Sequence, residues 1–252
     1  MRDFSEHSSS GGRADFGFAD VAVADKSRLV GGVFSRVAPY YDRMNDLMSA
    51  GLHRRWKDAA VLLCGARRGM RVLDLACGSG DLAARLLPRI SPGGNIALAD
   101  INLPMLNLAK QRITHPAARF IRCDGECLPF ADGSFDRVIT AFGLRNISRR
   151  ETALAEMRRV LRPGGLAAIL EFSPPAGTLA GIKTRFLQSG LPFLGESFFG
   201  DAESYRYLGE SVLRFPPPQA LCEMMCAAGF ARADFFNIAF GAVYLHRGRR
   251  IS

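Results

Sequence analysis

Lysine is scarce in this chain of 252 residues, where Lys26, Lys57, Lys110 and Lys183 are the only lysines. Arginine therefore carries most of the positive charge, and the formal net charge is +9. The basic residues are scattered, and no basic stretch is interleaved with aromatic residues as in RNA-binding motifs. We therefore expect no nucleic-acid partner. Weak attraction to an anionic membrane surface explains the net positive charge better than nucleic-acid binding does.

Long apolar runs and an export signal are also missing. No apolar run approaches the ~18 residues that a membrane-spanning helix needs, and the N-terminus lacks the apolar core of a signal peptide. The Ser- and Gly-rich start predicts a disordered arm over residues 1–25, followed by a single domain over 26–252. We expect a cytoplasmic protein, with peripheral attachment to the inner membrane face left open.

The pattern of cysteines does not predict a metal site. The six cysteines form no Cys-x-x-Cys pair, and the two pairs spaced four apart have no histidine nearby to complete a zinc site. In a cytosolic protein such cysteines are most often reduced and act as small apolar fillers. They are Cys64, Cys77, Cys123, Cys127, Cys222 and Cys226.

Strand and helix patterns alternate through most of the chain. After helical patterns over 26–65, the expected strands are 71–77, 95–100, 119–123, 135–142 and 166–172, with helices 81–87, 102–113 and 149–161 among them. A helix over 219–228 precedes strands 231–239 and 242–247, whose tight connection predicts an antiparallel hairpin. The alternation predicts an α/β protein with a mostly parallel seven-stranded sheet, helices on both faces and N-terminal helices.

The alternation stops between 173 and 215, where prolines and glycines are interleaved with phenylalanines and leucines. This composition predicts a turn-rich insert that forms a lid over an apolar substrate. A helix packed on the core is the alternative.

The most informative segment is a glycine turn between a strand and a helix, which contains Gly78, Ser79 and Gly80. Glycine lets a backbone approach a ligand closely, and a helix N-terminus offers free N–H groups. Asp100 ends the next strand, where an acidic side chain can bind the two hydroxyls of a ribose. The pattern predicts a site for a nucleoside-bearing cofactor at the carboxyl ends of the strands.

Acidic positions help to decide between cofactors. The glycine spacing also fits a dinucleotide fingerprint, but Asp74 lies in the strand just before the glycines. Its charge would repel a pyrophosphate and would hold a free amino group. Asp124 and Gly125 follow the third strand, shortly before a Leu-Pro-Phe sequence. We interpret the cofactor as cationic; a dehydrogenase site or an ordinary strand-to-helix turn is the alternative.

This series of motifs resembles the class I S-adenosylmethionine-dependent methyltransferases, which implies a Rossmann-like fold and S-adenosylmethionine as cofactor. Residues 41–56, which begin Tyr-Asp-Arg-Met-Asn and end His-Arg-Arg-Trp, resemble the N-terminal signature of the quinone-biosynthesis C-methyltransferases of bacteria and mitochondria. Residues 159–173 resemble the second signature of that family, with Arg162 where lysine is usual. The resemblance covers about 29–248.

The resemblance implies methyl transfer to a ring carbon of a lipophilic polyprenyl quinol, either 2-methoxy-6-polyprenyl-1,4-benzoquinol or demethylmenaquinol. It places cofactor contacts on Ser79, Asp100, Asp124 and Gly125, with Ala141 where the family has a serine. A membrane surface, a quinone-biosynthesis complex and a homodimer are the further partners considered. A methyltransferase of another lipophilic acceptor and a non-catalytic subunit that binds S-adenosylmethionine are the alternative functions.

Activation of the ring requires a further group. A phenol with a pKa near ~10 is little ionised at neutral pH, so a cation or a base beside its oxygen matters. Arg145, at the end of the fourth strand, is the first candidate to stabilise the phenolate, with a salt bridge to the following helix as the alternative. Asn146 could position the same oxygen, and Tyr41 could reach the site if the N-terminal helices fold over it. His53 is a weaker candidate base, because a packed or capping histidine is commoner.

Overall fold

Seven strands form one sheet in the computed structural model, which describes residues 12–251. Their order is β5-β4-β3-β6-β7-β9-β8; the first five are parallel, and β9 is antiparallel to both β7 and β8. The strands are β3 Arg71–Leu75, β4 Asn95–Asp100, β5 Ala118–Arg122, β6 Phe135–Ala141, β7 Leu161–Phe172, β8 Arg232–Asn237 and β9 Val243–Arg249. The predicted mostly parallel sheet with a C-terminal hairpin is confirmed.

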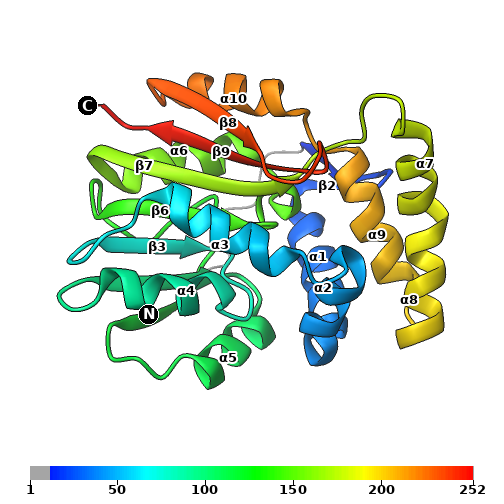
Figure 1. Ribbon diagram of the computed structural model, residues 1–252, viewed down its shortest axis with the longest axis horizontal. Helices are drawn as coiled ribbons and strands as arrows, with labels where there is room; N and C mark the ends of the chain where they lie inside the picture. Colours follow the sequence, from blue (N-terminus) through cyan, green and yellow to red (C-terminus); the bar gives the residue numbers. More distant parts are fainter. Residues whose placement is uncertain (1–11, 252) are drawn as a thin grey trace.

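Helices cover both faces of the sheet (Figure 1). Adjacent residues of a strand point to opposite faces, so Val72 packs in one apolar cluster and Leu73 in another, both fully buried. The first cluster includes side chains of α3, α4 and α5, and the second includes those of α6 and α10. These helices are α3 His53–Cys64, α4 Asp81–Ile90, α5 Leu103–Arg112, α6 Arg150–Val160 and α10 Pro218–Ala227.

A third apolar cluster lies at the carboxyl ends of the parallel strands, where Figure 1 shows α1, α2, α8 and α9 together. It joins the N-terminal helices α1 Val23–Val37 and α2 Tyr41–Ser49 to helices of the predicted lid. The valines at 30, 33 and 37 of α1 are buried on one helix face, as their spacing predicts. A short 3-10 helix, η1 Ala38–Tyr40, connects α1 to α2, and Pro39 lies in it.

The segment predicted to be rich in turns is mostly helical. It contains α7 Ala180–Arg185, a π-helical turn η3 Phe186–Gly190, α8 Leu191–Phe199 and α9 Ala202–Leu213. Its glycines permit close helix packing: a Cβ on Gly195 would overlap the ring of Tyr205, and one on Gly209 would overlap the carbonyl oxygen of Leu187. The alternative of a packed helix therefore describes α9, whose Tyr205, Tyr207 and Leu208 are buried.

The predicted disordered arm over 1–25 is wrong for its second half, while residues 1–11 lie outside the described part of the chain. Strands β1 Arg13–Phe16 and β2 Ala19–Ala22 form an antiparallel hairpin, and α1 begins at Val23. The side chain of Asp15 accepts hydrogen bonds from Lys26 Nζ (2.7 Å) and Arg150 Nη2 (2.6 Å). The ring of Phe16 stacks on that of Tyr207 at 4.4 Å. These contacts hold the hairpin to the domain.

Within residues 12–251, no helix combines the length and the apolar character needed to cross a bilayer.

Candidate functional site

A large cavity of about 790 Å³ opens at the carboxyl ends of β3, β4, β5 and β6. Its wall includes Gly78, Asp100, Asp124 and Gly125, which the sequence predicts as cofactor ligands. Asn146, which follows β6, also lines it. Parallel strands present their carboxyl ends at one edge of the sheet, so residues far apart in the sequence meet here.

Asp100 ends β4 with both carboxylate oxygens engaged. Oδ2 accepts a hydrogen bond from the backbone N–H of Gly78, and Oδ1 accepts one from that of Asn102, each at 2.8 Å. Burial raises the pKa of the Asp100 carboxyl from its ordinary value. Gly78 itself has φ +55°, a conformation that favours glycine. The carboxylate thus fixes the glycine turn and keeps accepting capacity for a ligand, because each oxygen has two lone pairs.

A second acidic wall follows β5. Asp124 Oδ1 accepts a hydrogen bond from the backbone N–H of Glu126 (2.9 Å), and burial raises the pKa of Asp124. A Cβ on Gly125 would lie 3.0 Å from Ile147 Cδ1, so this glycine leaves room at the wall. Glu126 is paired with Arg149 at 2.7 Å, whereas Asp100 and Asp124 have no salt-bridge partner among the described residues. Two acidic groups therefore remain to face a ligand.

The charge of the wall distinguishes the ligands that the cavity can take. Among the described residues that line it, none is lysine or arginine. The wall thus carries acidic groups with no cation beside them, which disfavours the anionic pyrophosphate of a dinucleotide. A ligand with positive charge and a ribose suits the same wall.

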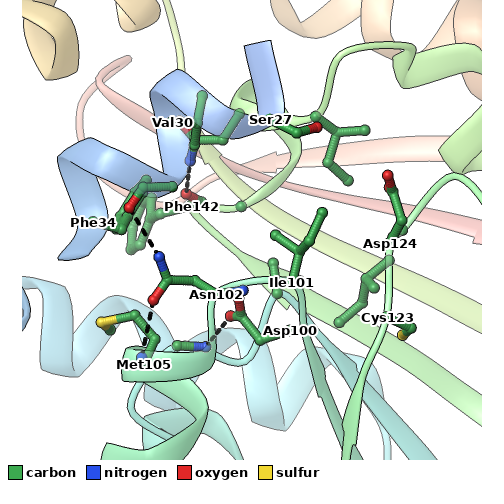
Figure 2. Close-up of a pocket in the computed structure, with 18 of the residues that line it drawn as sticks. Ser27, Val30, Phe34, Asp100, Ile101, Asn102, Met105, Cys123, Asp124 and Phe142 are labelled. Atoms are coloured by element: carbon green, nitrogen blue, oxygen red, sulfur yellow. Dashed lines mark hydrogen bonds between the residues drawn. The ribbon is translucent and has the colours of Figure 1, made fainter. Parts of the chain in front are cut away.

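Helix α1 covers the large cavity, as Figure 2 shows with Ser27, Val30 and Phe34 on the side opposite Asp100. Asn102 holds this cover: its Nδ2 donates to the carbonyl oxygen of Gly31 (3.0 Å) and to Ser35 Oγ (3.2 Å). Its Oδ1 accepts from the backbone N–H of Met105 and so caps α5. One side chain thus joins the floor of the cavity to its cover.

Three predicted cofactor residues do not line the large cavity. Asp74 is fully buried behind the turn, its carboxylate has no hydrogen-bond partner among the described residues, and burial raises its pKa well above the ordinary value. Ser79 is 1% exposed, and its hydroxyl also lacks a partner in residues 12–251. Gly80 contacts α5 instead, since a Cβ there would lie 3.3 Å from Ala109 Cβ. Contact between these residues and a cofactor stays a prediction.

A small cavity of about 380 Å³ lies beside the large one. Phe34, Tyr41 and Phe142 line both cavities. The other walls come from α2, the start of α3, the end of β7, and α9. Most of these side chains are apolar.

Arg145 lines the small cavity but is already paired. It is 4% exposed, and its Nη1 donates to Glu171 Oε1 (2.7 Å) and to the carbonyl oxygen of Phe142 (2.6 Å). Glu171 lies on β7, so the salt bridge joins the 3-10 turn that follows β6, Leu144–Asn146, to a strand rather than to the following helix. The guanidinium carbon lies 5.5 Å from the centre of the Phe172 ring. The Nε of Arg145 is buried and has no partner among the described residues.

Asn146 and Tyr41 occupy the expected region. Asn146 Nδ2 donates to the carbonyl oxygen of Phe142 (3.2 Å), and its Oδ1 accepts from the hydroxyl of Tyr207 (2.8 Å). The N-terminal helices do fold over the site, and a Cβ on Gly78 would lie 3.5 Å from the Tyr41 hydroxyl. Tyr41 therefore lies where the glycine turn and both cavities meet.

Several lining residues were not predicted from the sequence, chiefly Ser27, Gly31 and Phe34 of α1 and Asn102 of the β4–α5 loop. The Gly-Gly pair at 31–32 inside an amphipathic helix is the signal that could have indicated a close approach. No cluster of three or more His, Cys, Asp or Glu side chains that could hold a metal ion occurs in the described part of the chain.

Comparison with known proteins places these features in a family context. A family model described as the ubiE/COQ5 methyltransferase family matches residues 21–250. The chain is 46% identical over 252 residues to the ubiquinone/menaquinone biosynthesis C-methyltransferase UbiE of Bordetella avium, covering 99% of this chain and 98% of that protein. It is 44% identical over 239 residues to the UbiE of Francisella tularensis subsp. novicida, covering 93% and 96%.

Solved structures agree on the fold. A SAM-dependent methyltransferase from Thermotoga maritima gives a TM-score of 0.64 at 17% identity, covering 88% of this chain and 99% of that chain. One from Aquifex aeolicus gives 0.59 at 17% identity, covering 82% and 96%. A phosphoethanolamine N-methyltransferase from Haemonchus contortus, solved with S-adenosylhomocysteine, gives 0.56 at 16% identity, covering 74% and 50%. The fold is that of the class I SAM-dependent methyltransferases.

Proposed function

The chain belongs to the ubiE/COQ5 methyltransferase family, and from this premise we propose that it transfers a methyl group from S-adenosylmethionine to a ring carbon of a polyprenylated quinol in ubiquinone or menaquinone biosynthesis. The observation that carries the proposal is the pairing of cavities. An acidic cavity for a cationic donor shares Phe34, Tyr41 and Phe142 with a small apolar cavity for an aromatic acceptor.

The residues of the large cavity suit S-adenosylmethionine. Asp100 would accept hydrogen bonds from the ribose hydroxyls, and Asp124 would accept one from the adenine amino group. Gly78 has no side chain, so the cofactor can approach its backbone closely. When bound, the cofactor supplies a methyl group on a sulfonium that is its own leaving group, so no covalent enzyme intermediate is needed.

The small cavity would align the acceptor and keep water out. Phe142 and Phe172 offer flat apolar surfaces, with ring centres 4.5 Å apart. Phe142 has φ +59° and its carbonyl oxygen is held by both Arg145 and Asn146, so this wall is fixed in place. Arg145 would stabilise negative charge on a ring oxygen through its Nε, because its guanidinium stays charged at neutral pH. A fixed geometry of donor and acceptor is what methyl transfer requires most.

The test is incubation of the purified protein with methyl-labelled S-adenosylmethionine and either a short-chain demethylated benzoquinol or a demethylnaphthoquinol. We expect label in the ring of at least one quinol. Label in neither quinol, although calorimetry shows cofactor binding, would contradict the enzyme and favour a non-catalytic subunit. The choice between the two quinols names the acceptor.

We also propose that the outer lid helices contact the membrane that holds the quinol. Figure 1 shows α7 and α8 at the edge of the molecule, beyond α9. Lys183 and Arg185 in α7 supply positive charge beside apolar side chains, which suits an anionic bilayer. Lys183 Nζ donates to the carbonyl oxygen of Phe240 (3.4 Å), so the tip of the β8–β9 connection adjoins α7. The exposed apolar residues are Leu179, Ile182, Phe186, Phe193, Phe198 and Phe240, the last 99% exposed.

Vesicle sedimentation tests this surface. We expect the protein to sediment with vesicles that contain anionic lipid, and Ile182→Glu with Phe193→Glu to abolish this. Leu62→Glu is the matched control, because Leu62 is 63% exposed on α3 and lies outside the lid helices. Equal sedimentation of the double variant and the control would contradict the proposal.

A further inference from the structure

Three polar atoms without partners belong to side chains that line the small cavity. Among the described residues, Nδ1 of His53, Nδ2 of Asn45 and Nε of Arg145 have no hydrogen-bond partner, although each atom is buried. Buried polar groups in proteins are normally satisfied, so unsatisfied ones need an explanation. Their coincidence on one otherwise apolar cavity indicates that a bound molecule supplies the missing polar atoms.

His53 is held in a defined orientation. Its Nε2 lies 2.9 Å from Asp46 Oδ1, and its backbone N–H donates to Ser49 Oγ at 3.2 Å. Asp46 also accepts from Arg54, whose Nη2 lies 2.8 Å from Oδ2. Hydrogen bonds from His53 and Arg54 lower the pKa of Asp46, so this carboxylate is ionised at neutral pH. A carboxylate only accepts, so Nε2 carries the proton and Nδ1 presents a bare lone pair.

We propose that His53 is a catalytic base: its Nδ1 takes the proton of the acceptor's ring hydroxyl, Asp46 positions the imidazole, and Asn45 Nδ2 and Arg145 Nε donate to the ring oxygens. This inference rests on the proposed function, which it deepens by naming the group that activates the ring. Arg145 cannot take that role, because a guanidinium keeps its proton and this one is paired with Glu171. The two residues are complementary, one removing a proton and the other stabilising the charge left behind.

Burial keeps His53 neutral before the acceptor binds. Burial lowers the pKa of His53, the hydrogen bond to Asp46 raises it, and the nearby Lys57 lowers it. Lys57 is itself paired with Asp81 at 2.7 Å, and Asp81 raises the pKa of His53. Arg145 lines the same cavity but is compensated by Glu171. Because burial is the largest of these effects, His53 is unprotonated at pH 7 and can act as a base.

The reaction is balanced without an oxidant or a reductant. The ring O–H bond breaks and its proton bonds to Nδ1, while the electron pair left on oxygen moves into the ring. A carbon–carbon bond forms between the ring carbon and the donor methyl, and the carbon–sulfur bond breaks with its electron pair kept by sulfur. The ring carbon loses its hydrogen to solvent as a proton, and the imidazolium returns its proton to the ring oxygen. One proton is released in total.

The decisive variants are His53→Gln and Asp46→Asn, with His115→Gln as the matched control because His115 is exposed. We expect His53→Gln to bind S-adenosylmethionine within twofold of wild type and to lose about 10²- to 10⁴-fold in turnover. Wild-type kcat should fall at acid pH, as His53 becomes protonated. Asp46→Asn should move that decline to lower pH, since the carboxylate raises the proton affinity of His53. A merely structural role for Asp46 would not move it.

Nitrogen-15 NMR of the imidazoles gives a readout without turnover. Four histidines make assignment by substitution practical, and we expect His53 at pH 7 to be neutral with the proton on Nε2. Addition of 1-naphthol, a flat monophenol, should shift the His53 Nδ1 resonance and leave that of His115 unchanged. The inference would be overturned if His53 is charged at pH 7, if it carries its proton on Nδ1, or if saturating 1-naphthol does not shift its Nδ1 resonance.

Failure of the inference and failure of the proposed function look different. Turnover of His53→Gln within threefold of wild type, with the same decline at acid pH, removes His53 as the base and leaves the methyltransferase intact. Absence of methyl transfer by wild type removes the proposed function, and the NMR titration then still decides whether Nδ1 meets a ring hydroxyl.

Discussion

The large cavity and the small cavity differ in how their polar groups are satisfied. In the large cavity both oxygens of Asp100 accept backbone hydrogen bonds, so the site is formed before any ligand arrives. Among the described residues, three buried polar atoms of the small cavity's lining lack partners, against one in the lining of the large cavity, Ser148 Oγ. The comparison indicates a preformed site for a constant cofactor beside an incomplete site that the acceptor completes. Variants of each cavity should therefore fail in different ways.

The largest expected effect is on cofactor binding by Asp100→Ala. Two hydrogen bonds from ribose hydroxyls to a carboxylate contribute about 1.5–3 kcal/mol each. Their loss should weaken binding of S-adenosylmethionine by about 10²- to 10⁴-fold. Calorimetry measures this, and thermal unfolding checks that the glycine turn survives. An unchanged affinity would remove Asp100 from the site. The NMR response of His53 to 1-naphthol should persist, because the small cavity is untouched.

The next effect is on stability, through Arg145→Ala. This change leaves Glu171, which is 1% exposed, as a buried carboxylate without its cation. We expect the free energy of unfolding in urea to fall by about 3–5 kcal/mol. Arg145→Met combined with Glu171→Leu should recover most of that loss, because an apolar pair of similar size replaces the buried ions.

The double variant separates stability from chemistry. If Arg145 also stabilises negative charge on the ring oxygen, the recovered protein should still turn over slowly and should bind S-adenosylmethionine normally. Recovery of turnover together with stability would mean that Arg145 serves the fold alone.

A smaller effect is expected from Asn102→Ser. The serine hydroxyl can still cap α5, but it is too short to hold Gly31 and Ser35 on the cover. With one or two hydrogen bonds lost, S-adenosylmethionine should bind about 5- to 10-fold more weakly. Hydrogen exchange should become faster over residues 27–35 only. Unchanged exchange there would show that apolar contacts, rather than Asn102, hold the cover.

The smallest effect is a pH dependence that distinguishes the cavities. Burial raises the pKa of Asp100, so its carboxylate becomes protonated at a higher pH than that of an exposed aspartate. Cofactor affinity should therefore be constant near pH 7 and should fall as the pH drops through that raised pKa. His53→Gln should keep this decline in affinity, and Asp100→Asn should reduce it to the part that Asp124 contributes, because burial raises the pKa of Asp124 too. Calorimetry across pH checks both, and an undiminished decline in Asp100→Asn would assign it to other groups.

The sequence predicts the large cavity better than the small one. Parallel strands must end at one edge, so Gly78, Asp100, Asp124 and Gly125 could be brought together from spacing alone. Spacing could not show which glycine of the turn meets a ligand, and Gly80 packs against α5. The glycines of the lid predict turns, but a glycine-rich composition is equally typical of helices that pack closely together. Gly195 against Tyr205 is an example.

The small cavity is built by contacts that no local pattern specifies. Its walls join α2 and α3 to the end of β7 and to α9, so they exist only after the helices fold over the sheet. The sequence offers His53 only as a weak candidate base. Its proposed role depends on a contact that the sequence does not show: Asp46 binds Nε2 and leaves Nδ1 without a partner among the described residues. Likewise, the cover of the large cavity depends on a bond from Asn102 to Gly31, residues 71 positions apart.

The N-terminal hairpin has a practical consequence for handling this protein. Asp15 holds Lys26, whose Nζ also donates to the carbonyl oxygen of Ile147 (3.2 Å) on the wall of the large cavity. Phe16 stacks on Tyr207, whose hydroxyl donates to Asn146 on the same wall. A truncated chain that starts at α1, or a bulky affinity tag fused there, would therefore loosen the pocket while leaving the central sheet whole. Such a preparation would look well folded and still bind its cofactor poorly.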